Sequence, residues 1–251
     1  MKPDYPIIKT LLWLTLFSIA MGYLETAVVV YLRKLYFADG FRFPLSPVSP
    51  DIAVTEFWRE ACTIIMLLGA GIMAGRNGAQ KFVFFLYCFA VWDIFYYVFL
   101  KVLLGWPESL FTWDVLFLIP VPWVGPVLAP CIVAVTMILF TLVTVRLQSQ
   151  GRSGVTNWTE RGLLLTGVAV ILVSFMWDYF QFVANNPEAK GMWTLSSDQN
   201  LFSEARNYMP EHFNWLLFGC GEFILLGAIT LFFMRQVKQP QTVRTAAGVR
   251  H

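Results

Sequence analysis

The sequence is poor in charged residues and holds only two histidines, His212 and His251. Charged residues make up 14% of the chain, whereas a typical soluble domain carries about 25%. The net charge is only +2 and no cluster of Lys and Arg occurs, so nucleic acid is not an expected partner. The low charge indicates that most of the chain lies away from water.

Motifs of well-known catalytic sites are also missing. The chain has no HExxH or ExxH pattern and no GxSxG nucleophile turn. With one usable histidine, a zinc site or a haem group is not expected. The four cysteines, Cys62, Cys88, Cys131 and Cys220, are far apart and form no CxxC pair. They are typical of buried small apolar residues rather than of a redox or disulfide framework.

Long apolar stretches, in contrast, recur along the chain. A helix that spans the hydrocarbon core of a bilayer needs about 20 mostly apolar residues, and six stretches meet this requirement. We therefore predict an all-α, polytopic integral membrane protein in which residues 1–251 form a single bundle of about six transmembrane helices. The predicted spans are residues 11–32, 52–74, 82–104, 127–145, 163–184 and 213–233.

Two segments outside these spans have distinct compositions. The link at 106–125 is aromatic and apolar, but its prolines prevent a spanning helix. We expect a re-entrant or interfacial segment there, and an aromatic belt at the level of the lipid headgroups is the alternative. Residues 238–251 are polar, and we expect them to form a disordered cytoplasmic tail.

The distribution of charge predicts the orientation in the membrane. With six spans, both termini lie on the same side as the second-to-third and fourth-to-fifth links. That side holds eleven basic and two acidic residues, while the other side, which includes Arg33 and Asp114, holds six basic and eight acidic ones. Because basic residues favour the cytoplasmic side, we predict a cell (cytoplasmic) membrane protein with both termini in the cytoplasm.

Seven charged residues fall inside the predicted spans. A charge in hydrocarbon costs at least ~2.5 kcal/mol, so their repeated presence indicates a function. With a helix rise of ~1.5 Å per residue, none of them falls in the cytoplasmic half. We predict one shared polar layer that binds an ion or substrate and consists of Glu25, Glu56, Arg59, Glu60, Asp93, Asp178 and Glu222.

Three functions fit such a layer, and the sequence leaves open whether the protein is an enzyme. The preferred hypothesis is cation- or proton-linked binding and transport of a small ion or a polar substrate. The second is a metal-assisted membrane enzyme that acts on a lipid-linked substrate near the outer leaflet. The third is a non-catalytic accessory subunit, part of an oligomer or larger membrane complex, whose acids only hold the bundle together. The enzyme hypothesis places a divalent metal at Glu60, Asp93, Asp178, Glu222 and His212.

Two features predict how the helices pack. The second span ends in a patch of small residues with Gly69, Gly71 and Gly75, which favours close helix packing over a hinge. The fourth span has almost no polar stripe, so we expect it to be the helix most exposed to lipid.

Overall fold

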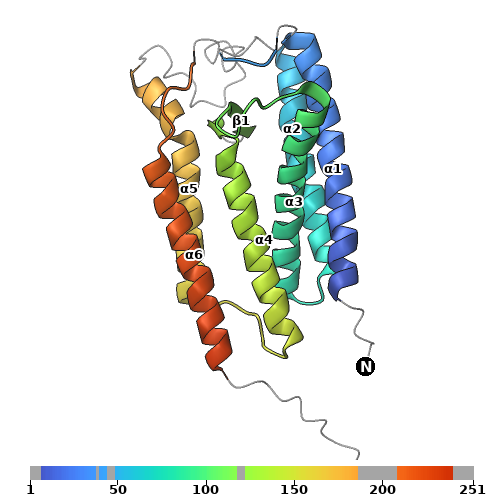
Figure 1. Cartoon of the computed structure of the whole chain (residues 1–251), viewed down its shortest axis with the longest axis vertical. Coiled ribbons are helices and arrows are strands. Elements are labelled where there is room, and N and C mark those ends of the chain that lie inside the picture. The colour runs from blue at the N-terminus through green and yellow to red at the C-terminus, as the bar shows by residue number, and fades with distance from the viewer. Residues whose placement is uncertain (1–6, 38–39, 44–48, 118–121, 186–207, 240–251) are drawn as a thin grey trace, which may run out of the picture.

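The computed structural model describes residues 7–37, 40–43, 49–117, 122–185 and 208–239. Within these ranges, six long helices run roughly side by side along the longest axis of the molecule (Figure 1). All six are long and apolar enough to cross a membrane. The protein is an all-α multi-pass membrane protein, as predicted. The helices are α1 (Ile7–Tyr36), α2 (Pro50–Ala74), α3 (Gly78–Leu104), α4 (Leu128–Ser149), α5 (Trp158–Asn185) and α6 (Trp215–Lys238).

Most helices extend beyond the apolar stretch that predicts them, and α3 shows how a polar residue and a glycine stabilise such helix ends. At the start of α3, the Asn77 side chain accepts a hydrogen bond from the Gln80 amide at 2.9 Å, so the helix begins four residues before the predicted span. At its end, Gly105 adopts the left-handed conformation with φ 69°, which glycine reaches without steric cost.

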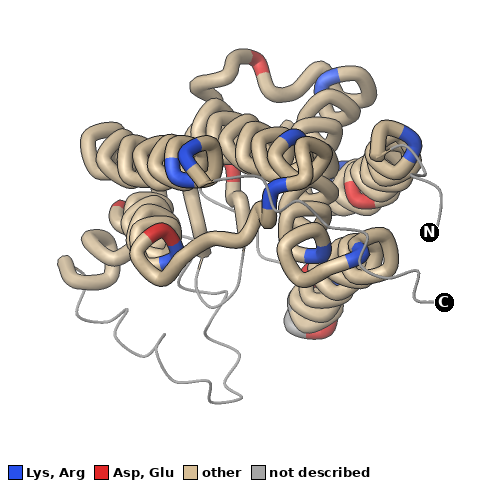
Figure 2. The backbone as a smooth tube through the Cα atoms, turned by 90° about the horizontal axis from the view of Figure 1, so that it is seen from below, with Lys and Arg blue, Asp and Glu red and all other residues tan. Residues whose placement is uncertain are grey.

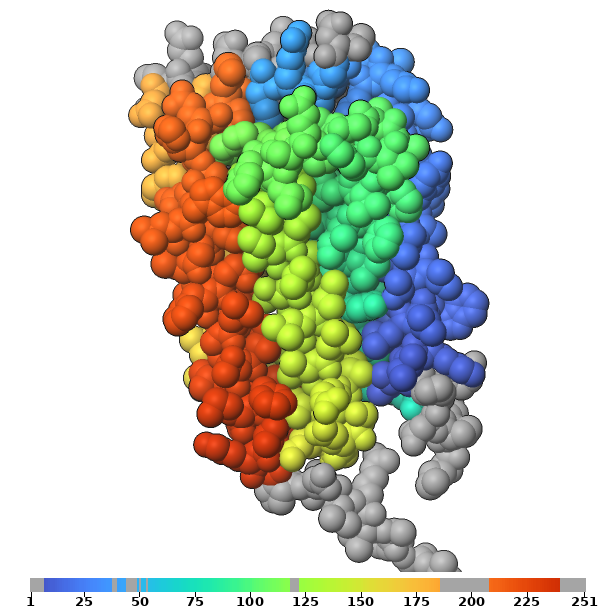
Figure 3. All heavy atoms as spheres, in the orientation of Figure 1, coloured from blue at the N-terminus to red at the C-terminus, as the bar shows by residue number. Residues whose placement is uncertain are grey.

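Helix α3 is central to one part of the bundle and packs against α1, α2 and α4. Helix α4 then packs against α6, and α6 against α5, so that α6, α4 and α3 lie next to one another on the face shown in Figure 3. Among the six described helices, α3 and α5 are not a closely packed pair. The expectation that the fourth span is the most lipid-exposed helix is wrong, because a smaller share of α1 and α2 is buried.

Glycines allow the closest helix contacts. A Cβ atom on Gly71 would lie 2.5 Å from the backbone nitrogen of Phe85 on α3. A Cβ on Gly221 of α6 would lie 2.6 Å from Cγ1 of Ile171 on α5. Gly71 and Gly75 at the end of the second span therefore pack closely against α3, in agreement with the prediction, whereas a Cβ on Gly69 would have no atom within 4 Å.

The link between α3 and α4 forms a short antiparallel hairpin of β1 (Trp113–Phe117) and β2 (Trp123–Pro126) at one end of the bundle (Figure 1). Asp114 is opposite Gly125, and the register shifts between Val115 and Phe117. This is the segment predicted as re-entrant or interfacial, but the strands were not anticipated. Prolines prevent this segment from forming a helix. The pairing of the two strands therefore satisfies backbone N–H and C=O groups that would otherwise lack partners.

The opposite end of the bundle carries the start of α1 and the end of α6. Figure 2 views this end and shows Lys and Arg at several helix ends, including the last turns of α4 and α6. Lys238 is the last residue of α6 and not part of a tail. The remainder of the predicted tail, residues 240–251, lies outside the described residues.

Candidate functional site

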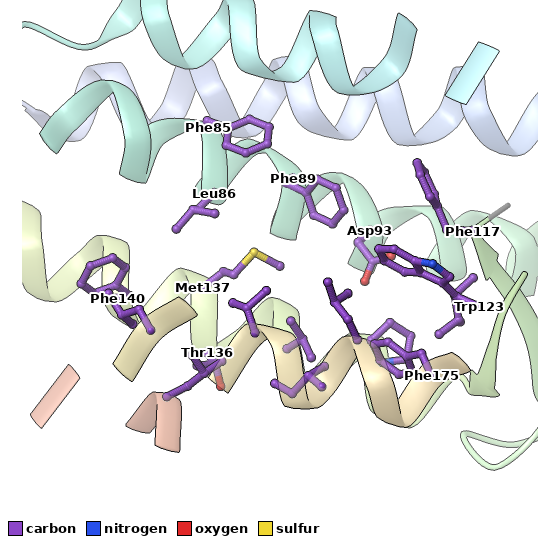
Figure 4. Close-up of a pocket in the computed structure, with 18 of the residues that line it drawn as sticks. Phe85, Leu86, Phe89, Asp93, Phe117, Trp123, Thr136, Met137, Phe140 and Phe175 are labelled. Atoms are coloured by element: carbon purple, nitrogen blue, oxygen red, sulfur yellow. The ribbon is translucent and has the colours of Figure 1, made fainter. Parts of the chain in front are cut away.

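A pocket of about 310 Å³ lies between α3, α4, α5 and α6, with the hairpin at one end. Its volume is within the range of small-molecule sites, about 300–1,000 Å³. Aromatic and aliphatic side chains form nearly all of its wall (Figure 4). Phe82 on α3 and Val168 on α5 both line it, yet they are 53% and 44% exposed. The pocket is therefore open between these two helices, toward the surroundings of the bundle.

Among the described residues that line this pocket, Asp93 on α3 is the only one with a charged side chain. Figure 4 shows its carboxylate at the same end as Trp123 and Phe117 of the hairpin. In the part of the chain that the structure describes, burial and the charge of Asp114 are the influences on Asp93, and no hydrogen bond or ion pair of its carboxylate is present. An ionised carboxylate without a partner in such surroundings costs several kcal/mol. Asp93 is thus either neutral or meets a partner that enters the pocket.

Glu222 on α6 lies close to the same pocket but behind its wall. Its Oε2 accepts a hydrogen bond from Oγ1 of Thr136 at 2.9 Å, and Thr136 lines the pocket. Its Oε1 is buried without a hydrogen-bond partner among the described residues. Glu222 is 7% exposed, and none of the ion pairs among the described residues includes it.

Glu25, Glu56 and Arg59 form a separate cluster between α1 and α2. Arg59 contacts Glu25 through Nη1 and donates from Nε to Oε2 of Glu56 at 2.8 Å. Thr63 Oγ1 donates to Oε2 of Glu25 at 3.3 Å. The Glu56–Arg59 contact joins residues three apart on one helix face, whereas the Glu25 contact joins two helices. Glu60 is half-buried on the same helix.

Asp178 on α5 forms two hydrogen bonds with the segment that precedes α6. Its Oδ2 accepts a hydrogen bond from the Tyr208 hydroxyl at 2.7 Å, and its Oδ1 accepts one from the backbone nitrogen of His212 at 3.2 Å. Burial and the hydrogen bond to Asp178 raise the pKa of Tyr208 above its ordinary value. The side chain of His212 is exposed, so it is the backbone of this residue, not its imidazole, that contacts the predicted site.

A buried ion pair near the hairpin was not predicted from the sequence. Arg33 of α1 and Asp114 of β1 both lie outside the predicted spans, but they are 3.5 Å apart, measured from Nη2 to Oδ1, and are both buried. The Arg33 guanidinium is 3.7 Å from the ring centre of Trp106 and 4.3 Å from that of Phe41. Burial raises the pKa of Asp114 to about 6, against the opposing effect of Arg33. One signal was present, because Asp114 is an acid within an aromatic, apolar link.

The predicted polar layer is thus divided among several places. Three of its members, Glu25, Glu56 and Arg59, are together, while Asp178 binds Tyr208, Glu222 binds Thr136 and Asp93 faces the pocket. Among the described residues, no group of three or more His, Cys, Asp or Glu is placed to hold a metal ion. The metal-ligand set expected from the sequence is therefore not assembled there.

Fold and pocket together define the class: a multi-pass α-helical membrane protein with a laterally open, aromatic pocket that contains one acid. No protein-family model, curated protein or solved structure matches the chain. Any functional conclusion therefore depends on the geometry of the pocket and on the chemistry of its residues.

Proposed function

We propose that the protein binds a lipid-like molecule, with an apolar body and a small polar group, in the pocket between α3, α4, α5 and α6. The observation that carries this proposal is the lone Asp93 carboxylate in an otherwise apolar pocket that opens beside the bundle. Few convergent polar groups in an apolar cavity are typical of small-molecule sites. A molecule dissolved in the bilayer could enter between Phe82 and Val168, which are both exposed.

The bilayer limits which interactions can contribute to the affinity of the pocket for such a ligand. A ligand that comes from the bilayer is already surrounded by hydrocarbon, so burying its apolar body yields little hydrophobic gain. The pocket must then favour the ligand by shape and by its polar end. This makes Asp93 the residue on which selectivity depends.

The test is photolabelling in nanodiscs with 1-dodecanol that carries a diazirine in its chain. Val168→Trp fills the mouth of the pocket and can be accommodated there, because Val168 is 44% exposed. Val173→Trp is the matched control on the same helix, since Val173 is exposed but does not line the pocket. We expect Val168→Trp to reduce labelling at least severalfold and Val173→Trp to leave it unchanged. Equal labelling of the wild type and both variants would contradict the proposal.

A second candidate function is the cation- or proton-linked transport inferred from the sequence. It is favoured by one specific observation, namely that Asp93 and Glu222 are intramembrane acids with no cationic partner among the described residues. Such acids are typical of proton relays and ion pathways. Proteoliposomes with an imposed pH gradient test it. The wild type should dissipate the gradient faster than a variant with Asp93→Asn and Glu222→Gln, and equal rates would contradict this candidate.

We also propose that the end of the bundle shown in Figure 2 faces the cytoplasm of a cell whose cytoplasmic membrane holds the protein. Basic residues near the ends of α4 and α6 support this orientation. Green fluorescent protein fused after residue 251 should fluoresce in a bacterial host, and alkaline phosphatase fused there should be inactive. Active phosphatase would show that this end of the bundle faces away from the cytoplasm, which would contradict the proposed orientation.

A further inference from the structure

The pocket and its wall carry acids but no base among the described residues. Asp93 faces the pocket at the end where the hairpin lies (Figure 4). Glu222 lies behind the wall at Thr136, and one of its carboxylate oxygens has no partner among the described residues. No described residue that lines the pocket is Lys, Arg or His. A ligand in the pocket therefore meets acidic groups that the wall itself does not compensate.

The arginines of α1 and α2 are engaged by other acids. Arg33 forms an ion pair with Asp114, and Arg59 forms ion pairs with a glutamate on each of the two helices. None of these pairs includes Asp93. In the described part of the chain, the neighbouring charge that acts on Asp93 is that of Asp114, another acid. A cation that enters the pocket would supply the compensation that the protein does not.

Aromatic rings lie at the same end of the pocket. Phe89 of α3 and Phe117 and Trp123 of the hairpin line it, and Figure 4 shows them around Asp93. The face of an aromatic ring attracts a cation through the ring quadrupole. A carboxylate among aromatic rings is therefore a favourable environment for an organic cation.

Charge separates a cation from other polar groups of similar size. An ammonium group donates hydrogen bonds to the Asp93 carboxylate and also neutralises its charge. A hydroxyl donates a hydrogen bond but leaves the negative charge in apolar surroundings, and a carboxylate adds a second negative charge. The ammonium group loses hydration when it enters the pocket, and its attraction to Asp93 and to the rings offsets that cost.

We propose, on the basis of the function proposed above, that the ligand is an amphiphilic amine in its cationic form, with its ammonium group against Asp93 and among the neighbouring rings. Its apolar body extends along the pocket toward Met137 and Phe140, which Figure 4 shows away from Asp93. Such a molecule dissolves in the bilayer and reaches the pocket through the lateral opening between α3 and α5.

The experiment compares unlabelled dodecylamine, 1-dodecanol and dodecane as competitors in the photolabelling assay. The nanodiscs contain phosphatidylcholine at about pH 7, where an alkylamine is protonated, and each competitor is quantified in the bilayer. We expect dodecylamine to compete about tenfold better than 1-dodecanol, the effect of adding a charge attraction to a hydrogen bond. Asp93→Asn should abolish this advantage and Asp93→Glu should retain it. Asp51→Asn is the matched control, because Asp51 is exposed at the start of α2 and does not line the pocket, and it should leave the advantage unchanged.

The other outcomes separate this inference from the proposed function. If dodecylamine and 1-dodecanol compete equally, the pocket does not select a cation, and the inference is overturned while the pocket stands. An advantage of dodecylamine that persists in Asp93→Asn would also overturn it, because the charge would then not be recognised at Asp93. If none of the three competes, the proposed function itself fails. The ratio between competitors is an internal measure, so a partly destabilised variant remains informative.

Discussion

The intramembrane acids of this protein differ in whether a cation accompanies them. Glu25 and Glu56 share Arg59, whereas Asp93 and Glu222 have no basic partner among the described residues. Paired acids in low dielectric depend on their partner, because removal of one charge leaves the other uncompensated. Unpaired acids can be neutralised without that cost. The two kinds of acid should therefore respond in opposite ways to substitution.

Arg59→Met should destabilise the protein by roughly 3 kcal/mol or more, because it leaves two acids without their cation. Thermal unfolding in detergent, followed by circular dichroism, measures the effect. Arg42→Met is the matched control, since Arg42 is an exposed basic residue, and it should change little. Adding Glu25→Gln to Arg59→Met should recover part of the loss. An Arg59→Met variant as stable as the control would contradict the role assigned to this cluster.

Asp114 should make stability depend on pH. Its pKa is about 6 in the folded protein against 3.8 for the free side chain, so between these values the folded state binds more protons than the unfolded state. Its contribution to the free energy of unfolding is therefore greatest below pH 4 and declines as the pH rises through about 6. The unfolding temperature of the wild type should therefore fall relative to that of Asp114→Asn as the pH rises from about 4 to above 6. Unfolding temperatures of both proteins, measured across this pH range, check this. Parallel curves would contradict the raised pKa.

At the scale of helices, glycines decide which pairs approach closely. Gly71 faces the backbone of α3 near Phe85, while a Cβ on Gly69, two residues earlier, would have no atom within 4 Å. The small-residue patch therefore has one side in contact with a neighbour and one side without. This difference provides a matched pair of substitutions within one helix.

Gly71→Ala should destabilise the protein by about 1–3 kcal/mol, because the added methyl group overlaps the backbone of α3. Gly69→Ala should be neutral or slightly stabilising, since alanine has the higher helix propensity. Thermal unfolding of the two variants under identical conditions checks this. The packing of α2 on α3 would have to be revised if the two substitutions had the same effect.

The helices could be predicted from the sequence because each one coincides with a long apolar stretch. The hairpin could not, since its strands have only five and four residues and lie in a link whose aromatic and proline content also fits an interfacial segment. The site was predicted only in part. The Glu56–Arg59 contact follows from spacing on one helix, but the partners of Glu25, Arg33 and Asp178 come from other elements. Such contacts depend on which elements pack together, and no local pattern in the sequence encodes that choice.

At the scale of the whole molecule, the pocket lies where α5 and α6 meet the other helices, and α5 and α3 are not a closely packed pair among the described helices. At both ends of this junction, contacts connect α5 or α6 to the rest of the molecule. Near one end, β2 of the hairpin contacts α5. Near the other, Arg152 Nη1 donates to the carbonyl oxygens of Val237 and Gln239 at 2.9 Å. The space between these ties is what we propose as the binding site for a lipid-like molecule.

The most direct test of the binding site is to locate the residues that the diazirine-bearing 1-dodecanol labels, by mass spectrometry of peptides from protein in nanodiscs. Labels should concentrate on pocket residues of α3, α4 and α5, such as Leu86, Met137 and Leu172, and excess 1-dodecanol should remove them. Labels spread over lipid-facing residues such as Leu16 and Met73, which are exposed on α1 and α2, with no competition by 1-dodecanol, would contradict it.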